Sequence, residues 1–82
     1  MPARPAKHSL TLQGHRTSVS LEAEFWRAFR EIAARQGKPI NVLAAEIDAA
    51  RGGDCGLASA IRLYVLADLQ ARVQGGAEPP AT

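Results

Sequence analysis

The sequence has too few cysteine and histidine residues to cross-link its fold through disulfides or a metal. Its 82 residues include one cysteine, Cys55, and two histidines, His8 and His15. A single cysteine cannot form an internal disulfide, and these three residues lack the spacing of zinc ligands. We therefore expect no metal site and no cofactor. Because a chain of this length is marginally stable alone, oligomerisation is the remaining source of stability.

Long apolar runs are also missing. The sequence contains no stretch of about 18 apolar residues, so we expect no transmembrane helix. Arg4 and Lys7 lie near the N-terminus, but no apolar segment follows them as it would in a secretory signal. We expect a cytoplasmic protein that does not interact with membranes.

Acidic residues are missing from the first 21 positions, which hold Arg4, Lys7, Arg16 and both histidines. The remaining residues carry seven basic and eight acidic groups, and the whole chain has a net charge of +2. A basic segment ahead of a near-neutral body is a mild indication of a polyanionic partner.

Recognisable catalytic groupings are missing too. Cys55 lies in a glycine-rich segment with no evident base beside it. Glu46 and Asp48 are two positions apart, so on a helix they do not face each other. The sequence shows no Ser-His-Asp set and no phosphate-binding glycine loop. We therefore do not expect an enzyme.

Prolines and small residues gather at both ends of the chain. They predict a flexible basic arm over residues 1–8 and a disordered tail over residues 74–82. The intervening residues 9–73 are long enough for one small domain.

Polar and apolar residues alternate over residues 9–21, as in a β-strand with one buried face. Leu10 and Leu12 fall on one parity, whereas Val19 and Leu21 fall on the other. We interpret the change near Gly14 as a bulge or bend within a single strand.

Three helices are expected after this strand, over residues 23–36, 40–50 and about 57–73. Gly37 suits the left-handed position that ends the first helix, and Pro39 suits the start of the second. Arg27–Glu31 and Glu31–Arg35 have the spacing of ion pairs on the first helix. The apolar face expected for the third helix consists of Leu57, Ile61, Val65, Leu69 and Val73.

One strand cannot satisfy its own backbone hydrogen bonds, and no second strong strand follows it. The same strand of a second chain is the simplest partner, in an antiparallel pair about a two-fold axis. The expected fold is thus mostly α with one N-terminal β-strand, β-α-α-α, in an intertwined homodimer with a two-stranded intermolecular ribbon. Arg16, Ser18 and Ser20 would stand on the open face of this ribbon, which fits the major groove of DNA.

Several motifs resemble the ribbon-helix-helix domains of the Arc and MetJ kind, in a short bacterial subfamily with a third helix. The motifs are His15–Glu22, Phe25-Trp26, the helix end at Gly37, Pro39-Ile40-Asn41, Ala45–Ala49 and Ser59–Arg62. Their order and spacing carry the resemblance, which covers residues 9–70.

The resemblance implies a role for each matching residue. The base-contacting strand positions of the family match Arg16, Ser18 and Ser20. The phosphate-binding start of the second helix matches Ile40, Asn41 and Val42, and Lys38 beside it would add a phosphate contact. The residues expected to form the dimer core are Val19, Leu21, Trp26, Phe29, Ile32, Leu43 and Ile47.

These features predict a sequence-specific transcriptional repressor. It would bind a two-fold operator in double-stranded DNA, as one dimer or as a dimer of dimers. Two other hypotheses keep the fold and change the partner. One is an antitoxin whose third helix or C-terminal tail holds a toxin, and the other is an adaptor that dimerises through the ribbon and binds only protein. A protein partner could bind through the third helix.

Overall fold

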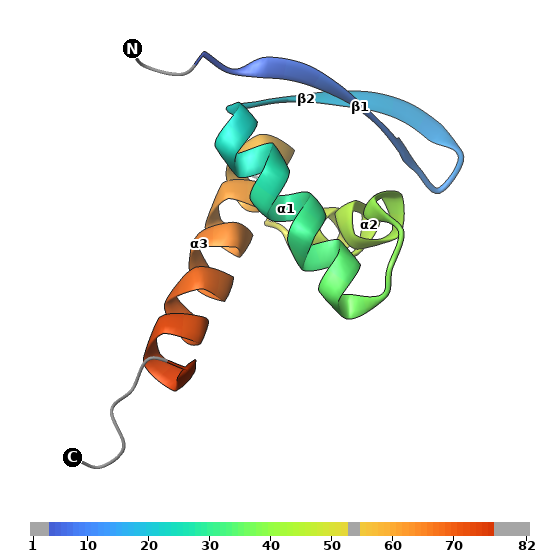
Figure 1. Cartoon of the computed structure of the whole chain (residues 1–82). Coiled ribbons are helices and arrows are strands. Elements are labelled where there is room, and N and C mark those ends of the chain that lie inside the picture. The colour runs from blue at the N-terminus through green and yellow to red at the C-terminus, as the bar shows by residue number, and fades with distance from the viewer. Residues whose placement is uncertain (1–3, 53–54, 77–82) are drawn as a thin grey trace, which may run out of the picture.

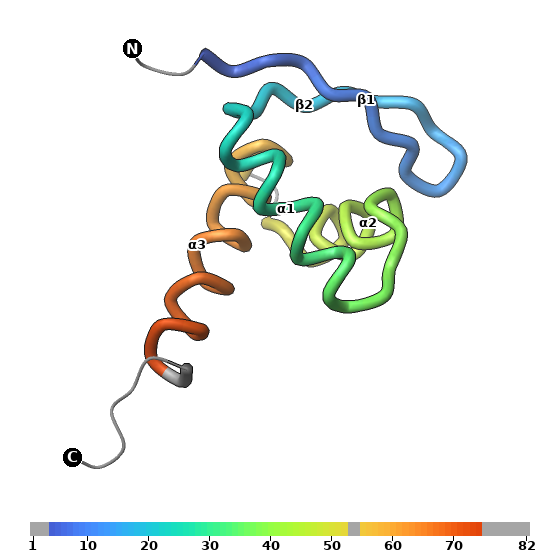
Figure 2. Tube along the Cα trace, viewed as in Figure 1, coloured from blue at the N-terminus to red at the C-terminus, as the bar shows by residue number. Residues whose placement is uncertain are grey.

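The structure is a computed structural model that describes residues 4–52 and 55–76. Two strands form a hairpin that lies over three helices, and α3 runs away from the hairpin past α1 (Figures 1 and 2). The mostly helical fold with an N-terminal β element is confirmed. The elements in chain order are β1 (Ala6–Leu12), β2 (His15–Leu21), α1 (Ala23–Gln36), α2 (Ile40–Ala50) and α3 (Leu57–Gly76).

The hairpin corrects the prediction of a single strand that must pair with a second chain. β1 and β2 are antiparallel partners within one chain, with Leu12 opposite His15 and Ala6 opposite Leu21. β1 begins inside residues 1–8, which the sequence predicted as a flexible arm. The backbone of β2 therefore finds its partner in the strand directly before it and needs no second chain on that edge.

The two residues between the strands explain the change of parity near Gly14. Gln13 and Gly14 have φ values of 53° and 86°. Positive φ at both central residues matches a type I′ turn, whose twist suits a two-residue hairpin. Because Leu12 faces His15 across this turn, even-numbered residues of β1 share a face with odd-numbered residues of β2. The feature interpreted as a bulge is thus a turn.

The first two helices begin and end where the sequence predicted. Gly37 follows α1 with a left-handed φ of 68°, and its N–H donates to the carbonyl of Ala34. Lys38 donates to the carbonyl of Ala33 at 3.0 Å, which completes a Schellman motif. Pro39 occupies the N-cap position of α2.

The core lies between the inner face of the hairpin and the three helices. All of its fully covered members are apolar, and no buried polar side chain lacks a partner within the described residues. The buried side chains are Leu10, Val19, Leu21, Phe29, Ile32, Ala33, Leu43, Ala44, Ile47, Ile61 and Val65.

α3 keeps only part of its predicted apolar face in the core. Ile61 and Val65 are buried, whereas Leu69 and Val73 are 48% and 57% exposed. The reason is geometric: each four-residue step overshoots a helical turn by about 40°, so the row drifts around the helix. The predicted tail, residues 74–82, lies beyond the described part of the chain except for the last residues of α3.

Polar contacts tie α3 to α1. Arg35 pairs with Asp68 at 2.8 Å, so it bridges to α3 and not to Glu31 as expected. Gln36 donates to the Tyr64 hydroxyl at 2.8 Å. Both contacts lie on the surface and link two helices that also share the core.

Candidate nucleic-acid interface

The outer face of the hairpin, turned away from the helices, carries three cross-strand pairs of polar side chains. Since the members of a cross-strand pair point to the same side of a sheet, all six side chains share one surface. The pairs are Lys7–Ser20, Ser9–Ser18 and Thr11–Arg16. All six residues are exposed. The surface has two cations, four hydroxyl groups and no acid, so it offers hydrogen-bond donors and acceptors to a polyanion.

The sequence predicted half of this surface. Arg16, Ser18 and Ser20 lie on the outer face, as the alternation of β2 indicated. Their partners from β1 were missed because Lys7 was assigned to the arm, while Ser9 and Thr11 were assigned to the same single strand as Arg16. The alternation of polar residues with His8, Leu10 and Leu12 was the signal that marks β1 as a strand. The six side chains expected from two chains are therefore present in one.

The inner face of the hairpin holds this surface in place. Leu10, Val19 and Leu21 are buried against the helices. At the edge of β1, the backbone N–H of Thr11 donates to Asn41 Oδ1 at 3.0 Å. The Asn41 side chain therefore links the hairpin to the first turn of α2.

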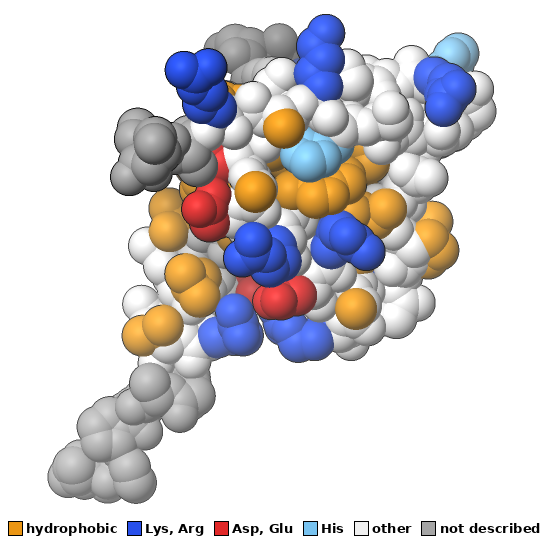
Figure 3. Space-filling view, turned by 45° about the horizontal axis from the view of Figure 1, so that its top comes forward, with side chains coloured by type: hydrophobic (Ala, Val, Ile, Leu, Met, Phe, Trp, Pro, Cys, Tyr) orange, Lys and Arg blue, Asp and Glu red, His pale blue; other side chains and the backbone are white. Residues whose placement is uncertain are grey.

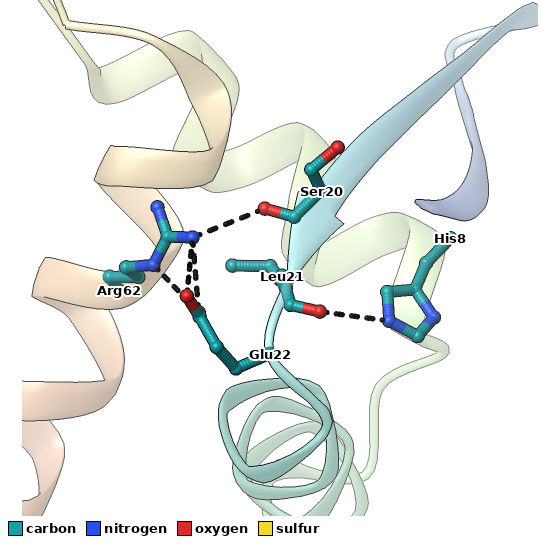
Figure 4. A network of polar contacts seen from close by, with 5 residues as sticks. All are labelled: His8, Ser20, Leu21, Glu22 and Arg62. Atoms are coloured by element: carbon teal, nitrogen blue, oxygen red, sulfur yellow. Dashed lines mark hydrogen bonds and ion pairs between the residues drawn. The ribbon is translucent and has the colours of Figure 1, made fainter. Parts of the chain in front are cut away.

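Arg62 of α3 anchors the junction between β2 and α1 (Figure 4). Its Nε and Nη2 donate to the two carboxylate oxygens of Glu22 at 3.0 and 3.3 Å. Nη2 also donates to the Ser20 carbonyl at 3.3 Å. A hydrogen bond from the backbone at Glu22 lowers the pKa of the Glu22 carboxyl, partial burial opposes this, and the Arg62 guanidinium lowers it further.

His8 anchors the same junction from β1. Its ring stacks on Trp26 with centroids 4.1 Å apart and planes 7° apart. Its Nε2 lies 3.3 Å from the Leu21 carbonyl. Figure 4 marks this contact with a dashed line. The half-buried Trp26 therefore supports the hairpin as well as the core.

The predicted phosphate-contacting residues gather at the start of α2. The N–H of Val42 donates to the Pro39 carbonyl at 3.0 Å, whereas the N–H groups of Ile40 and Asn41 have no acceptor among the described residues. Lys38 lies beside them, with Nζ 2.7 Å from Glu46 Oε1. Two free amides and the positive end of the helix dipole thus face solvent near β1.

The seven residues expected in a dimer core belong to the core of one chain. Six of them are buried and Trp26 is half-buried. That any of them packs between two chains stays a prediction.

Five of the ten cations have no acidic partner within the described ranges. Three belong to the hairpin segment and two to α1: Arg4, Lys7, Arg16, Arg27 and Arg30. Lys and Arg side chains spread over this side of the molecule in Figure 3, with few acidic side chains between them. The surface that includes the hairpin is therefore electropositive, although the net charge is small.

Residues 4–52 and 55–76 contain neither a cluster of metal-binding side chains nor a helix that could span a membrane. These residues hold no group of three or more His, Cys, Asp or Glu that could bind a metal ion. None of the helices described is both long and apolar enough to cross a membrane.

The comparison with known proteins agrees with this geometry. The profile of the ribbon-helix-helix domain family matches residues 5–69, which include both strands and most of α3. No curated protein and no solved structure matches the chain. Because the match covers far more than half of the sequence and its fold is the one observed, the chain belongs to the ribbon-helix-helix domain family.

Proposed function

We propose that this protein is a sequence-specific DNA-binding transcriptional regulator, a cytoplasmic repressor that acts as a homodimer. The family consists of DNA-binding regulators and antitoxins and is not typically enzymatic. The observation that carries the proposal is the outer face of the hairpin, with six exposed polar side chains, two of them cationic and none acidic.

The shape and chemistry of the hairpin suit the major groove. This groove of B-DNA is about 12 Å wide and admits a two-stranded ribbon. Arg16 would pair with a guanine through two hydrogen bonds, while Ser18 and Ser20 would donate to or accept from neighbouring bases. Lys7 lies in the same row and adds a positive charge at the other end of the ribbon.

Phosphate contacts would fix the orientation of the hairpin. We assign them to the free amides of Ile40 and Asn41, with Val42 completing the first turn of α2 and Lys38 exchanging Glu46 for a phosphate. The unpaired Arg27 and Arg30 of α1 extend the electropositive surface beside the hairpin. Such contacts supply affinity without reading the sequence.

The homodimer supports recognition of a two-fold operator. One hairpin reaches only a few base pairs, so two chains related by a two-fold axis would read two half-sites. A dimer of dimers on adjacent sites would lengthen the recognised sequence further.

The test is selection of DNA fragments from a genomic pool by the purified protein at moderate and at raised salt. We expect a few fragments that share a short repeat. Arg16→Ala should weaken binding to those fragments by about 1–3 kcal/mol and relax the sequence preference, because a bidentate base contact is lost.

Arg72→Ala is the matched control, because Arg72 is an exposed arginine of α3 that pairs with Asp68 far from the hairpin. It should select the same fragments as the wild type. If both variants lost the same amount of binding affinity, the effect of Arg16→Ala would come from the lower net charge and not from a base contact. Recovery of no fragment by the wild type would refute DNA binding and favour a toxin or another protein as the partner.

A further inference from the structure

An open hollow on the surface is lined by one face of α1 and by His8 of β1. Its volume is about 440 Å³. Hollows of about 300–1,000 Å³ are the size that holds small organic ligands. Besides small residues, the lining consists of an aromatic pair, two cations and one acid: His8, Trp26, Arg27, Arg30 and Glu31. In Figure 3 a histidine lies against hydrophobic side chains, with Lys or Arg side chains close by.

The aromatic pair forms an ordered wall of the hollow. The His8 ring lies parallel to the Trp26 ring, with centroids 4.1 Å apart, and both residues are half-buried. Behind them the Trp26 ring packs at 6.1 Å on the ring of Phe29, which is fully buried. A wall of stacked rings attracts another planar ring, and nucleobases stack on such walls whatever their sequence. The wall therefore favours a ligand with a flat aromatic ring.

The two cations of the hollow are available for an anion. Arg27 and Arg30 are exposed, lie one helical turn apart, and form no ion pair with the acids of residues 4–52 and 55–76. A guanidinium binds a phosphate through two parallel hydrogen bonds. A terminal phosphate carries a charge of about −1.5 to −2 at neutral pH, whereas each phosphate of a nucleic-acid backbone carries one negative charge. Two arginines therefore match a terminal phosphate better.

Glu31 restricts the ligand further. It follows Arg30 directly, is exposed, and forms no ion pair with the residues described. A carboxylate only accepts hydrogen bonds, so a ligand beside it must bring a donor. The amino group on the ring of adenine or guanine is such a donor, and a purine covers more of an aromatic wall than a pyrimidine does.

We propose that this hollow binds a free purine nucleotide. The base stacks on the wall of His8 and Trp26, its amino group donates to Glu31, and the phosphate binds Arg27 and Arg30. A second step rests on the proposed function, in which these two arginines contact DNA phosphates. A bound nucleotide takes both arginines away from the DNA, so it acts as a ligand that releases the regulator.

The first test uses the fluorescence of Trp26, which is the only tryptophan in the sequence. The wild type is titrated with adenosine monophosphate in the absence of DNA. We expect saturable quenching, because a base that stacks beside the indole changes its emission. Adenosine lacks the phosphate and ribose phosphate lacks the base, so each should compete at least tenfold more weakly than adenosine monophosphate.

Three variants test the assigned contacts. Arg27→Gln/Arg30→Gln should bind adenosine monophosphate at least tenfold more weakly. Arg72→Gln is the matched control, because Arg72 pairs with Asp68 on α3, and it should bind as the wild type does. Glu31→Ala should lose the preference for adenosine monophosphate over inosine monophosphate, which lacks the amino group. All the substituted residues are exposed, so the far-ultraviolet circular dichroism of each variant should match that of the wild type.

The release step is tested on a selected DNA fragment. Saturating adenosine monophosphate should weaken DNA binding by the wild type several-fold. Ribose phosphate at the same concentration should have no such effect, although it carries the same charge. The nucleotide should not change DNA binding by Arg27→Gln/Arg30→Gln, because that variant lacks the arginines for which nucleotide and DNA compete.

Three results would overturn the nucleotide site: no quenching, equal affinity in the wild type and Arg27→Gln/Arg30→Gln, or competition by adenosine or ribose phosphate as strong as that by the nucleotide. A strand of four adenine nucleotides that binds at least tenfold more tightly would assign the hollow to single-stranded nucleic acid instead. A wild type that binds the nucleotide but selects no DNA fragment would support the site and refute the proposed function. Unchanged DNA affinity with the nucleotide bound would refute the release step.

Discussion

Arg62 and Glu22 show how a single side-chain contact can link three elements. Glu22 lies between β2 and α1, at the N-cap position of α1, but its side chain does not cap the helix. Its carboxylate receives the Arg62 guanidinium instead, and that guanidinium lies 5.9 Å from the centre of the Phe25 ring. The contact joins residues 40 positions apart, so no local pattern in the sequence predicted it.

Glu22→Gln should change how stability depends on pH. The pKa of Glu22 is lowered in the folded protein from an ordinary value of 4.5. Its stabilising contribution is therefore complete above about pH 4.5 and is lost as the pH falls through the lowered value. We expect the wild type to exceed the variant in urea midpoint at neutral pH, and the difference to shrink as the pH falls below 4.5 through the lowered pKa.

Glu31→Gln is the control for this measurement. Glu31 is an exposed acid in the middle of α1, and it forms no ion pair with the residues described. Its effect on the urea midpoint should be small and should change little between neutral and acidic pH. A difference for Glu22→Gln that persists unchanged into acid would contradict the role of its charge.

At the scale of elements, the hairpin depends on its two-residue turn. Gly14 has a φ of 86°, a conformation that is costly for any residue with a Cβ. A Cβ at Gly14 would meet no atom within 4 Å, so the cost of Gly14→Ala comes from the backbone alone. We expect Gly14→Ala to lower the free energy of unfolding by about 1–2 kcal/mol, measured by urea denaturation.

Gly52→Ala is the matched control for the turn. Gly52 also has open space around it, and its φ lies outside the left-handed region. This substitution should leave the free energy of unfolding within about 0.5 kcal/mol of the wild type. Equal effects of the two substitutions would mean that the turn conformation does not limit the stability of the hairpin.

The elements that the sequence predicted well are those with local signals at their ends. Gly37 and Pro39 mark the boundary between α1 and α2 through backbone preferences of their own. β1 had no such signal, since Gln13-Gly14 differs from the common Asn-Gly turn and the prolines upstream indicated an arm. The length of α3 was underestimated because its last turns make no core contact that a pattern could reveal.

The same distinction applies to the candidate site. Strand alternation alone placed Arg16 and Ser18 on an open face, because facing in a strand follows from parity. The link from Asn41 to Thr11 depends on how α2 meets the edge of β1, and that is a tertiary contact. Asn41 was therefore assigned only to phosphate, although its side chain also supports the hairpin.

At the scale of the whole molecule, charge and apolar surface are separated. The cations without acidic partners lie on the hairpin segment and α1, whereas most of the exposed large apolar side chains lie on α3. The other five cations, which include Arg35 at the end of α1, are held in ion pairs. A net charge of +2 therefore understates the field over the hairpin.

This separation predicts how salt affects DNA binding. Each phosphate contact contributes about 0.9 to the slope of log affinity against log salt concentration. We expect Arg27→Gln/Arg30→Gln to reduce that slope by about 1–2 and to weaken binding equally on specific and unrelated DNA. Arg72→Gln, which also removes a positive charge, should leave the slope unchanged because Arg72 pairs with Asp68 on α3.

Fluorescence anisotropy on one selected fragment and one scrambled fragment, at four salt concentrations, measures both the affinity and the salt slope. A slope that changes equally in all variants would assign the salt effect to net charge, and a loss confined to the selected fragment would assign Arg27 and Arg30 to base recognition.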